Sequence, residues 1–161
     1  MQWNDLVING ATKSMKHLQP LVFAFDVAGQ KLTVKFEFGF HCFTDDKGEG
    51  ELLRHKGEKR YFCPSRYHCS TQLRDYIERR FFEGMVVPHN SKHGGQRYFC
   101  LDLHDYAIFF SISKPQGTTN HLRLHVISAY DVANWGRHSL PRGKAFNVRY
   151  VLEMRNNGKS V

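Results

Sequence analysis

The sequence predicts a single α+β domain, residues 1–161, in which a mainly antiparallel, twisted sheet carries one main helix, at about residues 70–83, on one face. Two observations predict this fold. Segments of alternating apolar and polar residues, as in half-buried strands, occur before and after one segment with helical periodicity. Strands on either side of a helix are typical of α+β domains. The composition is globular, because 41% of the residues are hydrophobic and 13 are Phe.

The N-terminal part of the chain predicts a short helical segment followed by a β-hairpin. Residues 1–19 are mixed in character, and we expect a short helix around Thr12–Leu18. The run Leu21–Val27 predicts one strand. The run Lys31–Phe40 predicts the next, because its apolar and polar residues alternate with a period of two. The letters AGQ around Gly29 are typical of a hairpin turn.

The period changes near the middle of the chain. Ser70 is placed to cap the start of a helix, and Gly84 is placed to end it. The apolar residues between them fall on one helical face: Leu73, Tyr76, Ile77 and Phe81. This pattern predicts the main helix.

The alternating pattern returns after a polar loop, PHNSKHGG at Pro88–Gly95. Period-two alternation predicts four more strands: Arg97–Leu103, Tyr106–Ser113, Leu122–Tyr130 and Ala145–Met154. The helix is therefore expected to lie between two groups of strands.

The tetrapeptide RYFC occurs twice, at Arg60–Cys63 and at Arg97–Cys100. The first copy is followed by the predicted helix and the second by more strand, so we interpret them as two amphipathic strands rather than as a structural repeat. No pair of cysteines has the C-x₂₋₄-C spacing of a zinc site, and no metal is predicted. A zinc-stabilised interaction domain remains an alternative, with three cysteines and a histidine as ligands: Cys63, Cys69 and Cys100.

The net charge of +8 favours an anionic partner. Residues 137–161 contain six Lys and Arg and a single Glu, and therefore carry +5 of this charge. Nucleic acid is the commonest partner of this kind, and RNA is expected before DNA. An acidic protein, such as an antitoxin, is the alternative partner. The sequence has no apolar run long enough to cross a bilayer and no signal-like N-terminus, so we expect a cytoplasmic protein without a membrane partner.

Polar residues share one face on each of the last two predicted strands. In the first strand they are His121, Arg123 and His125, and in the second they are Asn147, Arg149 and Glu153. If the two strands are neighbours, the sheet presents all of these side chains together.

These residue types suit the cleavage of a phosphodiester. His125 would act as the acid or base, with Arg123 and Arg149 as phosphate ligands. Glu153 would be a second base or an orienting group. A ribose 2′-hydroxyl is an internal nucleophile, so positioning supplies much of the rate and no metal or other cofactor is predicted. The alternative is a solvated polar face, which any one-sided antiparallel sheet presents.

Two further groups of residues are candidates for binding nucleic acid. An aromatic and basic loop of the kind that stacks on bases and contacts phosphates contains Trp135, Arg137, His138, Arg142 and Lys144. Arg66 and His68 lie near the start of the predicted helix, where backbone N–H groups can help to hold a phosphate. The alternatives are a tryptophan that covers one end of the core and an ordinary connection before the helix.

The segments DYAIFFSISKP, HLRLHVISAY and KAFNVRYVLEM, within Arg97–Met154, give about a third of the chain a resemblance to a known group. In order of elements it resembles the small metal-independent ribonucleases of the barnase–EndoU–colicin–RelE group. The resemblance implies a curved antiparallel sheet with His, Arg and Glu on its concave face, and cleavage of RNA, often beside an antitoxin or immunity partner. This chain departs from the group in having two strong strands and a helix before the matching region. A metal-independent endoribonuclease is therefore the leading hypothesis, and a non-enzymatic module that binds nucleic acid or an acidic protein is its rival.

Overall fold

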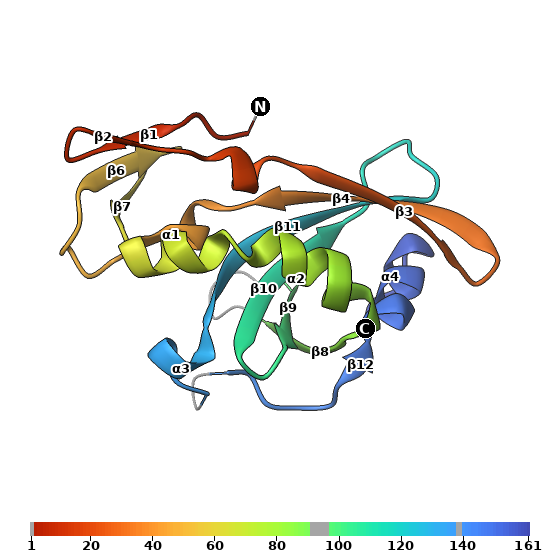
Figure 1. The fold of residues 1–161 in the computed structure, drawn as a ribbon. Coiled ribbons are helices and arrows are strands. Elements are labelled where there is room, and N and C mark those ends of the chain that lie inside the picture. Colours follow the sequence, from red (N-terminus) through yellow and green to blue (C-terminus); the bar gives the residue numbers. More distant parts are fainter. Residues whose placement is uncertain (1, 91–96, 138–139) are drawn as a thin grey trace.

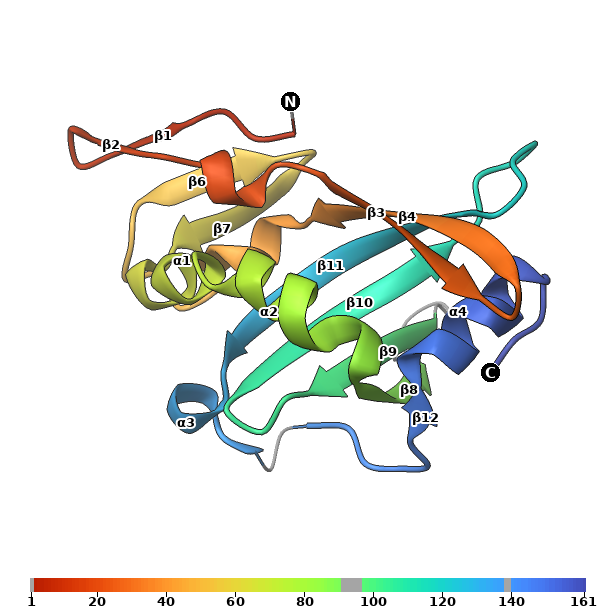
Figure 2. The ribbon, with the colours of Figure 1, turned by 45° about the vertical axis from the view of Figure 1, so that its right-hand side comes forward.

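A curled, mostly antiparallel sheet of seven strands and a bent helix that crosses one of its faces make up most of the fold (Figures 1 and 2). The computed structural model describes residues 2–90, 97–137 and 140–161, without the side chains of residues 134 and 135. The predicted α+β class is confirmed. In the described part of the chain, no helix is long and apolar enough to cross a membrane.

The chain begins with a β-hairpin. Strands β1 (Leu6–Ile8) and β2 (Ala11–Lys13) pair antiparallel across Asn9–Gly10, where both residues have positive φ angles. An Asn-Gly pair is the strongest short-range signal for a tight hairpin turn. The helix expected around Thr12–Leu18 is therefore wrong, since only the 3-10 turn η1 (Lys16–Leu18) is helical.

The large sheet has the strand order β12-β8-β9-β10-β11-β4-β3. Its strands are β3 (Leu21–Val27), β4 (Gln30–Phe38), β8 (Met85–Asn90), β9 (Arg97–Asp102), β10 (Tyr106–Ser113), β11 (His121–Asp131) and β12 (Phe146–Asn147). The β3–β4 hairpin and the strands β9, β10 and β11 confirm the alternation in the sequence. β8 extends through Pro88 to Asn90, so the loop expected from Pro88 begins later, and its remaining residues lie outside the described part of the chain.

One pair of neighbouring strands in the large sheet is parallel. β4 and β11 run in the same direction, whereas the neighbouring pairs on either side of them are antiparallel. The parallel register places Lys35 opposite Arg123 and Glu37 opposite His125. This pairing joins the first hairpin of the chain to the strand that carries the predicted histidine.

A second, smaller sheet follows β4 through the 3-10 turn η2 (Phe40–Cys42). Its order is β5-β7-β6, and its strands are β5 (Thr44–Asp45), β6 (Leu52–His55) and β7 (Glu58–Phe62). The second RYFC segment lies wholly in β9, and the first lies in β7 except for Cys63, which comes directly before α1; the two strands belong to different sheets. All four cysteines are buried and free, in line with their reading as small apolar residues.

The main helical segment covers one face of the large sheet, as predicted. It consists of α1 (Pro64–Ser70), α2 (Leu73–Arg80) and the 3-10 turn η3 (Phe81–Glu83), and it crosses in front of β10 and β11 in Figure 1. The segment starts at Pro64, a residue favoured in the first helical turn. Ser70 is therefore not the N-cap that we expected: it is buried, and its hydroxyl donates to the Tyr67 carbonyl at 2.6 Å. The predicted stop at Gly84 is confirmed.

The segment predicted as the last strand, Ala145–Met154, is mostly a helix. Only β12 is extended, and α4 (Val148–Asn156) follows it. The Asn147 side chain caps α4 by accepting a hydrogen bond from the Arg149 backbone N–H at 2.9 Å. Three apolar residues at helical spacing bury one side of α4 in the core: Val148, Val151 and Leu152.

The two faces of the large sheet differ in what packs against them. On the covered face, the apolar strand residues and helices α1, α2 and α4 share one core, which draws side chains from Trp3 to Leu152. The opposite face, which we call the open face, carries the polar residues that alternate with them. Its central side chains are Lys35, Glu37, Ser111, Arg123 and His125. Near α3 (Val132–Trp135), a small apolar cluster that includes Leu140 covers one end of the open face.

Candidate functional site

The predicted catalytic residues lie on two different sides of the sheet. Arg123 and His125 are on β11 and face the open side. Arg149 and Glu153 are on α4, which packs on the covered face. The prediction that all four share one face is therefore wrong, because the segment that carries Arg149 and Glu153 is not a neighbouring strand of β11.

The two residues of α4 have partners of their own. Arg149 donates to Glu83 at 2.8 Å, and its guanidinium lies 5.5 Å from the centre of the Phe25 ring. Glu153 lines a cavity of about 160 Å³ beside Gln30, at the β3–β4 turn. Neither side chain belongs to the environment of His125.

The predicted loop for nucleic acid is only partly described. Arg137 forms an ion pair with Asp102 and donates to the His104 carbonyl at 2.7 Å. Arg142 lines a cavity of about 290 Å³ beside this pair, and the Lys144 ammonium lies 5.3 Å from the centre of the Phe146 ring. The side chain of Trp135 and all of His138 lie outside the described part of the chain.

Arg66 and His68, both on α1, do not act together. Arg66 donates to the carbonyls of His41 and Thr44, at 3.0 and 3.2 Å, and so supports the segment between β4 and β5. Its guanidinium also lies 5.8 Å from the centre of the Tyr130 ring. His68 is exposed and lines a separate groove on the other side of α1.

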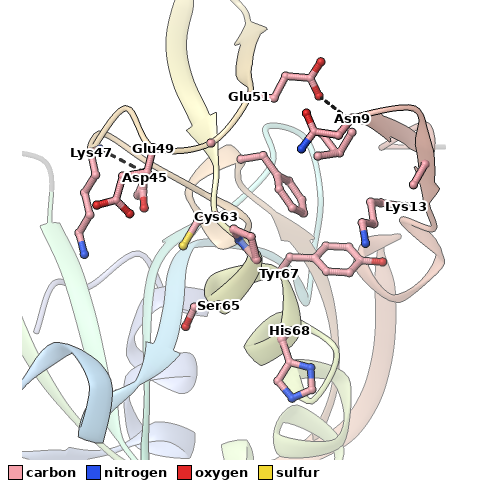
Figure 3. Close-up of a pocket in the computed structure, with 15 residues that line it drawn as sticks. Asn9, Lys13, Asp45, Lys47, Glu49, Glu51, Cys63, Ser65, Tyr67 and His68 are labelled. Carbon is pink, nitrogen blue, oxygen red and sulfur yellow. Dashed lines mark hydrogen bonds between the residues drawn. The ribbon is translucent and has the colours of Figure 1, made fainter.

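This groove, of about 1010 Å³, lies between the β1–β2 hairpin, the loop after β5 and the start of α1 (Figure 3). Tyr67 crosses it and donates to the Ser14 carbonyl at 2.7 Å. Charges of both signs line it, from Asp45, Glu49, Glu51, Lys13 and Lys47. Burial raises the pKa of the Cys63 thiol, so this thiol is protonated and weakly nucleophilic at neutral pH. The groove therefore favours neither a polyanion nor cysteine catalysis.

His125 occupies a restricted position on the open face. Its ring lies directly against Gly39, where a Cβ atom would come within 2.9 Å of the His125 Nε2. Burial lowers the pKa of His125 below its usual value of 6.5. Glu37 raises it, and the positive charges of Lys56 and His41 lower it further. The imidazole is therefore mostly neutral at pH 7, as a general base requires.

A second histidine, His41 in η2, is part of the same environment. Its Nε2 lies 2.6 Å from the Glu58 Oε1 at the start of β7, and both side chains are partly exposed. Burial lowers the pKa of His41, the hydrogen bond to Glu58 raises it, and the nearby Arg60 lowers it. The carboxylate both orients the ring and stabilises its protonated form.

Sequence reasoning missed His41 and Glu58. His41 is in the turn η2 after β4, whereas Glu58 begins β7 of the smaller sheet. The β6–β7 hairpin brings Glu58 and the turn residue Lys56 toward the open face. No spacing in the sequence links either residue to His125. The only local signal was the turn itself, Lys56-Gly57, in which both residues have positive φ angles.

Aromatic rings lie along the open face next to this environment. Ser111 on β10 pairs with His125 on β11. Phe109 lies two residues before Ser111, on the same side of β10. The Phe109 ring stacks on Tyr130 with 5.6 Å between centroids, and its centroid lies 6.2 Å from that of His89. Half-buried rings beside a charged strand are the type of surface on which single-stranded bases stack.

The zinc alternative receives no geometric support. Across residues 2–90, 97–137 and 140–161, no three His, Cys, Asp or Glu side chains are close enough to hold a metal ion. Cys100 belongs to the small cluster beside α3, whereas Cys69 belongs to the main core.

Comparison with known proteins identifies a family. The model of the YjaZ family matches residues 5–155, which is nearly the whole chain. No curated protein and no solved structure matches. The match names no ribonuclease, so the resemblance to the barnase–EndoU–colicin–RelE group stays a prediction. The chain belongs to the YjaZ family.

Proposed function

We propose that this protein binds RNA on the open face of its large sheet and cleaves it without a metal ion, with His125 and His41 as an acid–base pair. The observation that carries the proposal is that these two histidines share one electrostatic environment on the open face. His41 lies close enough to lower the pKa of His125, and Glu58 holds the His41 ring at 2.6 Å. Two imidazoles with distinct partners can serve as the base at one end of a phosphodiester and as the acid at the other.

The roles follow from the partners. Burial lowers the pKa of His41 overall, and the hydrogen bond to Glu58 opposes this lowering. We assign His41 as the acid because its protonated form has a hydrogen-bonded carboxylate partner. His125 lies near Lys56 and His41, whose positive charges favour its neutral form, which makes His125 the base.

The reaction uses the ribose 2′-hydroxyl as the nucleophile. His125 takes the 2′-hydroxyl proton as the 2′-oxygen bonds to phosphorus, and His41 gives a proton to the 5′-oxygen as the P–O5′ bond breaks. The products are a 2′,3′-cyclic phosphate and a 5′-hydroxyl. Lys56 supplies positive charge for the phosphorane. Because the nucleophile belongs to the substrate, positioning replaces the activation of a water molecule.

Cleavage of labelled RNA in the presence of EDTA tests the proposal. We expect cleavage with 2′,3′-cyclic phosphate ends, and a loss of about 10²–10⁴-fold in His125→Ala and in His41→Ala. His68→Ala is the control for the loss of a histidine, since His68 is exposed and lines the separate groove on the other side of α1. RNA that stays intact with the wild-type protein contradicts the proposed catalysis. Retention of intact RNA that weakens with salt would instead identify a binding module.

A further inference from the structure

We infer that Lys35 and Arg123 form a subsite for a second phosphate, next to the phosphate that is cleaved. The inference rests on the proposed function for the direction of the RNA across the open face. With this subsite, the substrate is an oligonucleotide that has at least two consecutive phosphates.

The first argument is the pairing of two like charges. Lys35 on β4 and Arg123 on β11 are directly opposite each other on one face of the sheet. Like charges in this arrangement destabilise a sheet, so the pair favours anions near the two side chains. Their side chains are 47% and 50% exposed, and an anion in solution can reach both.

The second argument is that a single carboxylate, that of Glu37, forms ion pairs with both cations. The Lys35 Nζ lies 3.3 Å from the Glu37 Oε1, and the Arg123 Nε lies 3.8 Å from the same oxygen. Glu37 cancels one of the two charges, and the cluster of three side chains keeps a net charge of +1. The two cations are about half exposed and Glu37 is 26% exposed, so both contacts are partly screened by solvent, and an incoming anion can compete with Glu37 for the cations.

The third argument is a cavity at the same place. A depression of about 180 Å³ is lined by Lys35 and Arg123 together with His121 and Thr33. Pro115 and Leu122 add apolar surface to it. Cationic groups with an apolar side suit a phosphate and part of its ribose, whereas a cavity of this size is too small for a whole nucleotide.

The spacing along β11 connects the subsite to the histidine pair. Arg123 and His125 are two residues apart on the same face, which is about 7 Å along a strand. Successive phosphates of an extended single strand are separated by a similar step. An RNA that places one phosphate at His125 therefore places a neighbouring one at Lys35 and Arg123.

Binding of an octanucleotide of 2′-O-methyl RNA, which lacks the nucleophile, tests the subsite without cleavage. We expect the slope of log K against log salt to become smaller by about 0.7 in the double variant Lys35→Gln, Arg123→Gln, since one phosphate contact is lost. Lys31→Gln is the control for loss of charge, because Lys31 is exposed on the same face of β4. Glu37→Gln is the second variant, and it should bind the octanucleotide at least threefold more tightly because it releases both cations.

The outcomes separate the subsite from the proposed catalysis. A smaller slope in the double variant, together with tighter binding by Glu37→Gln, supports the subsite even if the protein cleaves no RNA. Slopes equal to that of Lys31→Gln, or weaker binding by Glu37→Gln, overturn it even if RNA is cleaved. Thermal unfolding of each variant verifies that the protein is folded in the binding assay.

Discussion

His125 lies directly against Gly39, with space for a hydrogen atom but not for a methyl group. A Cβ atom at Gly39 would come within 2.9 Å of the His125 Nε2 and within 3.0 Å of the Val126 carbonyl oxygen. The Gly39 N–H donates to this same carbonyl at 2.7 Å, so the backbone cannot move away without losing a hydrogen bond. The close approach of β4 to β11 thus fixes where the histidine ring lies.

Gly39→Ala should therefore displace the His125 ring and destabilise the fold. We expect a loss of about 1–3 kcal/mol in the free energy of unfolding, typical of overpacking. RNA cleavage should fall as well, because the imidazole of His125, the proposed general base, is displaced from its position on the open face. Urea unfolding and cleavage rates measure the two effects. Unchanged stability and unchanged cleavage would contradict the contact between Gly39 and His125.

Glu58→Gln tests which histidine is the acid. The carboxylate raises the pKa of His41 through its hydrogen bond, against the lowering effect of burial. Its loss should lower the pKa of His41 further. Activity falls as pH rises through the pKa of the acid, so the alkaline limb of the pH profile should move to lower pH. The pH dependence of kcat/KM measures this limb, and a limb that stays in place or moves to higher pH would exclude His41 as the acid.

The stability of the protein should decrease as pH falls from 7.5 to 5.5. Burial lowers the pKa of four histidines in the folded state: His17, His41, His89 and His125. The unfolded chain then binds more protons than the folded chain below about pH 6.5, so the free energy of unfolding falls with pH in this window. Urea midpoints at the two pH values measure the effect. A midpoint that is constant or higher at pH 5.5 would show that the histidines are not desolvated.

Phe109→Leu should weaken the binding of single-stranded RNA about tenfold, because leucine fills the same space but offers no ring on which a base can stack. The Phe109 ring stacks on Tyr130, so Tyr130→Phe is the matched control that keeps both rings. Fluorescence anisotropy with 2′-O-methyl RNA measures the affinities. If both variants bind like the wild type, the bases do not stack on these rings.

The strands, and the faces on which their residues lie, could be predicted where one side of an element is apolar and the other is polar. Alternation in β4 and β11 placed the core residues on one face and Arg123 and His125 on the other, as the structure has them. The site as a whole could not be predicted, because His41 and Glu58 reach it through a parallel pairing and a second sheet. Local periodicity contains no information about which distant strands become neighbours.

The segment after Ala145 shows a second limit of predicting secondary structure from the sequence, because its apolar residues fit the period of a strand and that of a helix at once. Phe146, Val148, Tyr150 and Leu152 alternate as in a strand, yet Val148, Val151 and Leu152 also follow the spacing of a helix. Tyr150 decides between them, since it is 45% exposed and so does not belong to a buried row. The sequence signal for the helix was Asn147, a favoured N-cap residue before the apolar run.

Asn147→Ala should therefore cost about 1 kcal/mol in the free energy of unfolding, since the cap of α4 is lost. Asn157→Ala is the matched control, because Asn157 follows the end of the same helix and is exposed. Chemical denaturation of both variants measures the difference. Leu152→Ala should cost more, about 2–5 kcal/mol, because Leu152 is fully buried in the core. If Asn147→Ala and Asn157→Ala are equally stable, the side chain of Asn147 does not cap α4, and the start of this helix has to be placed elsewhere.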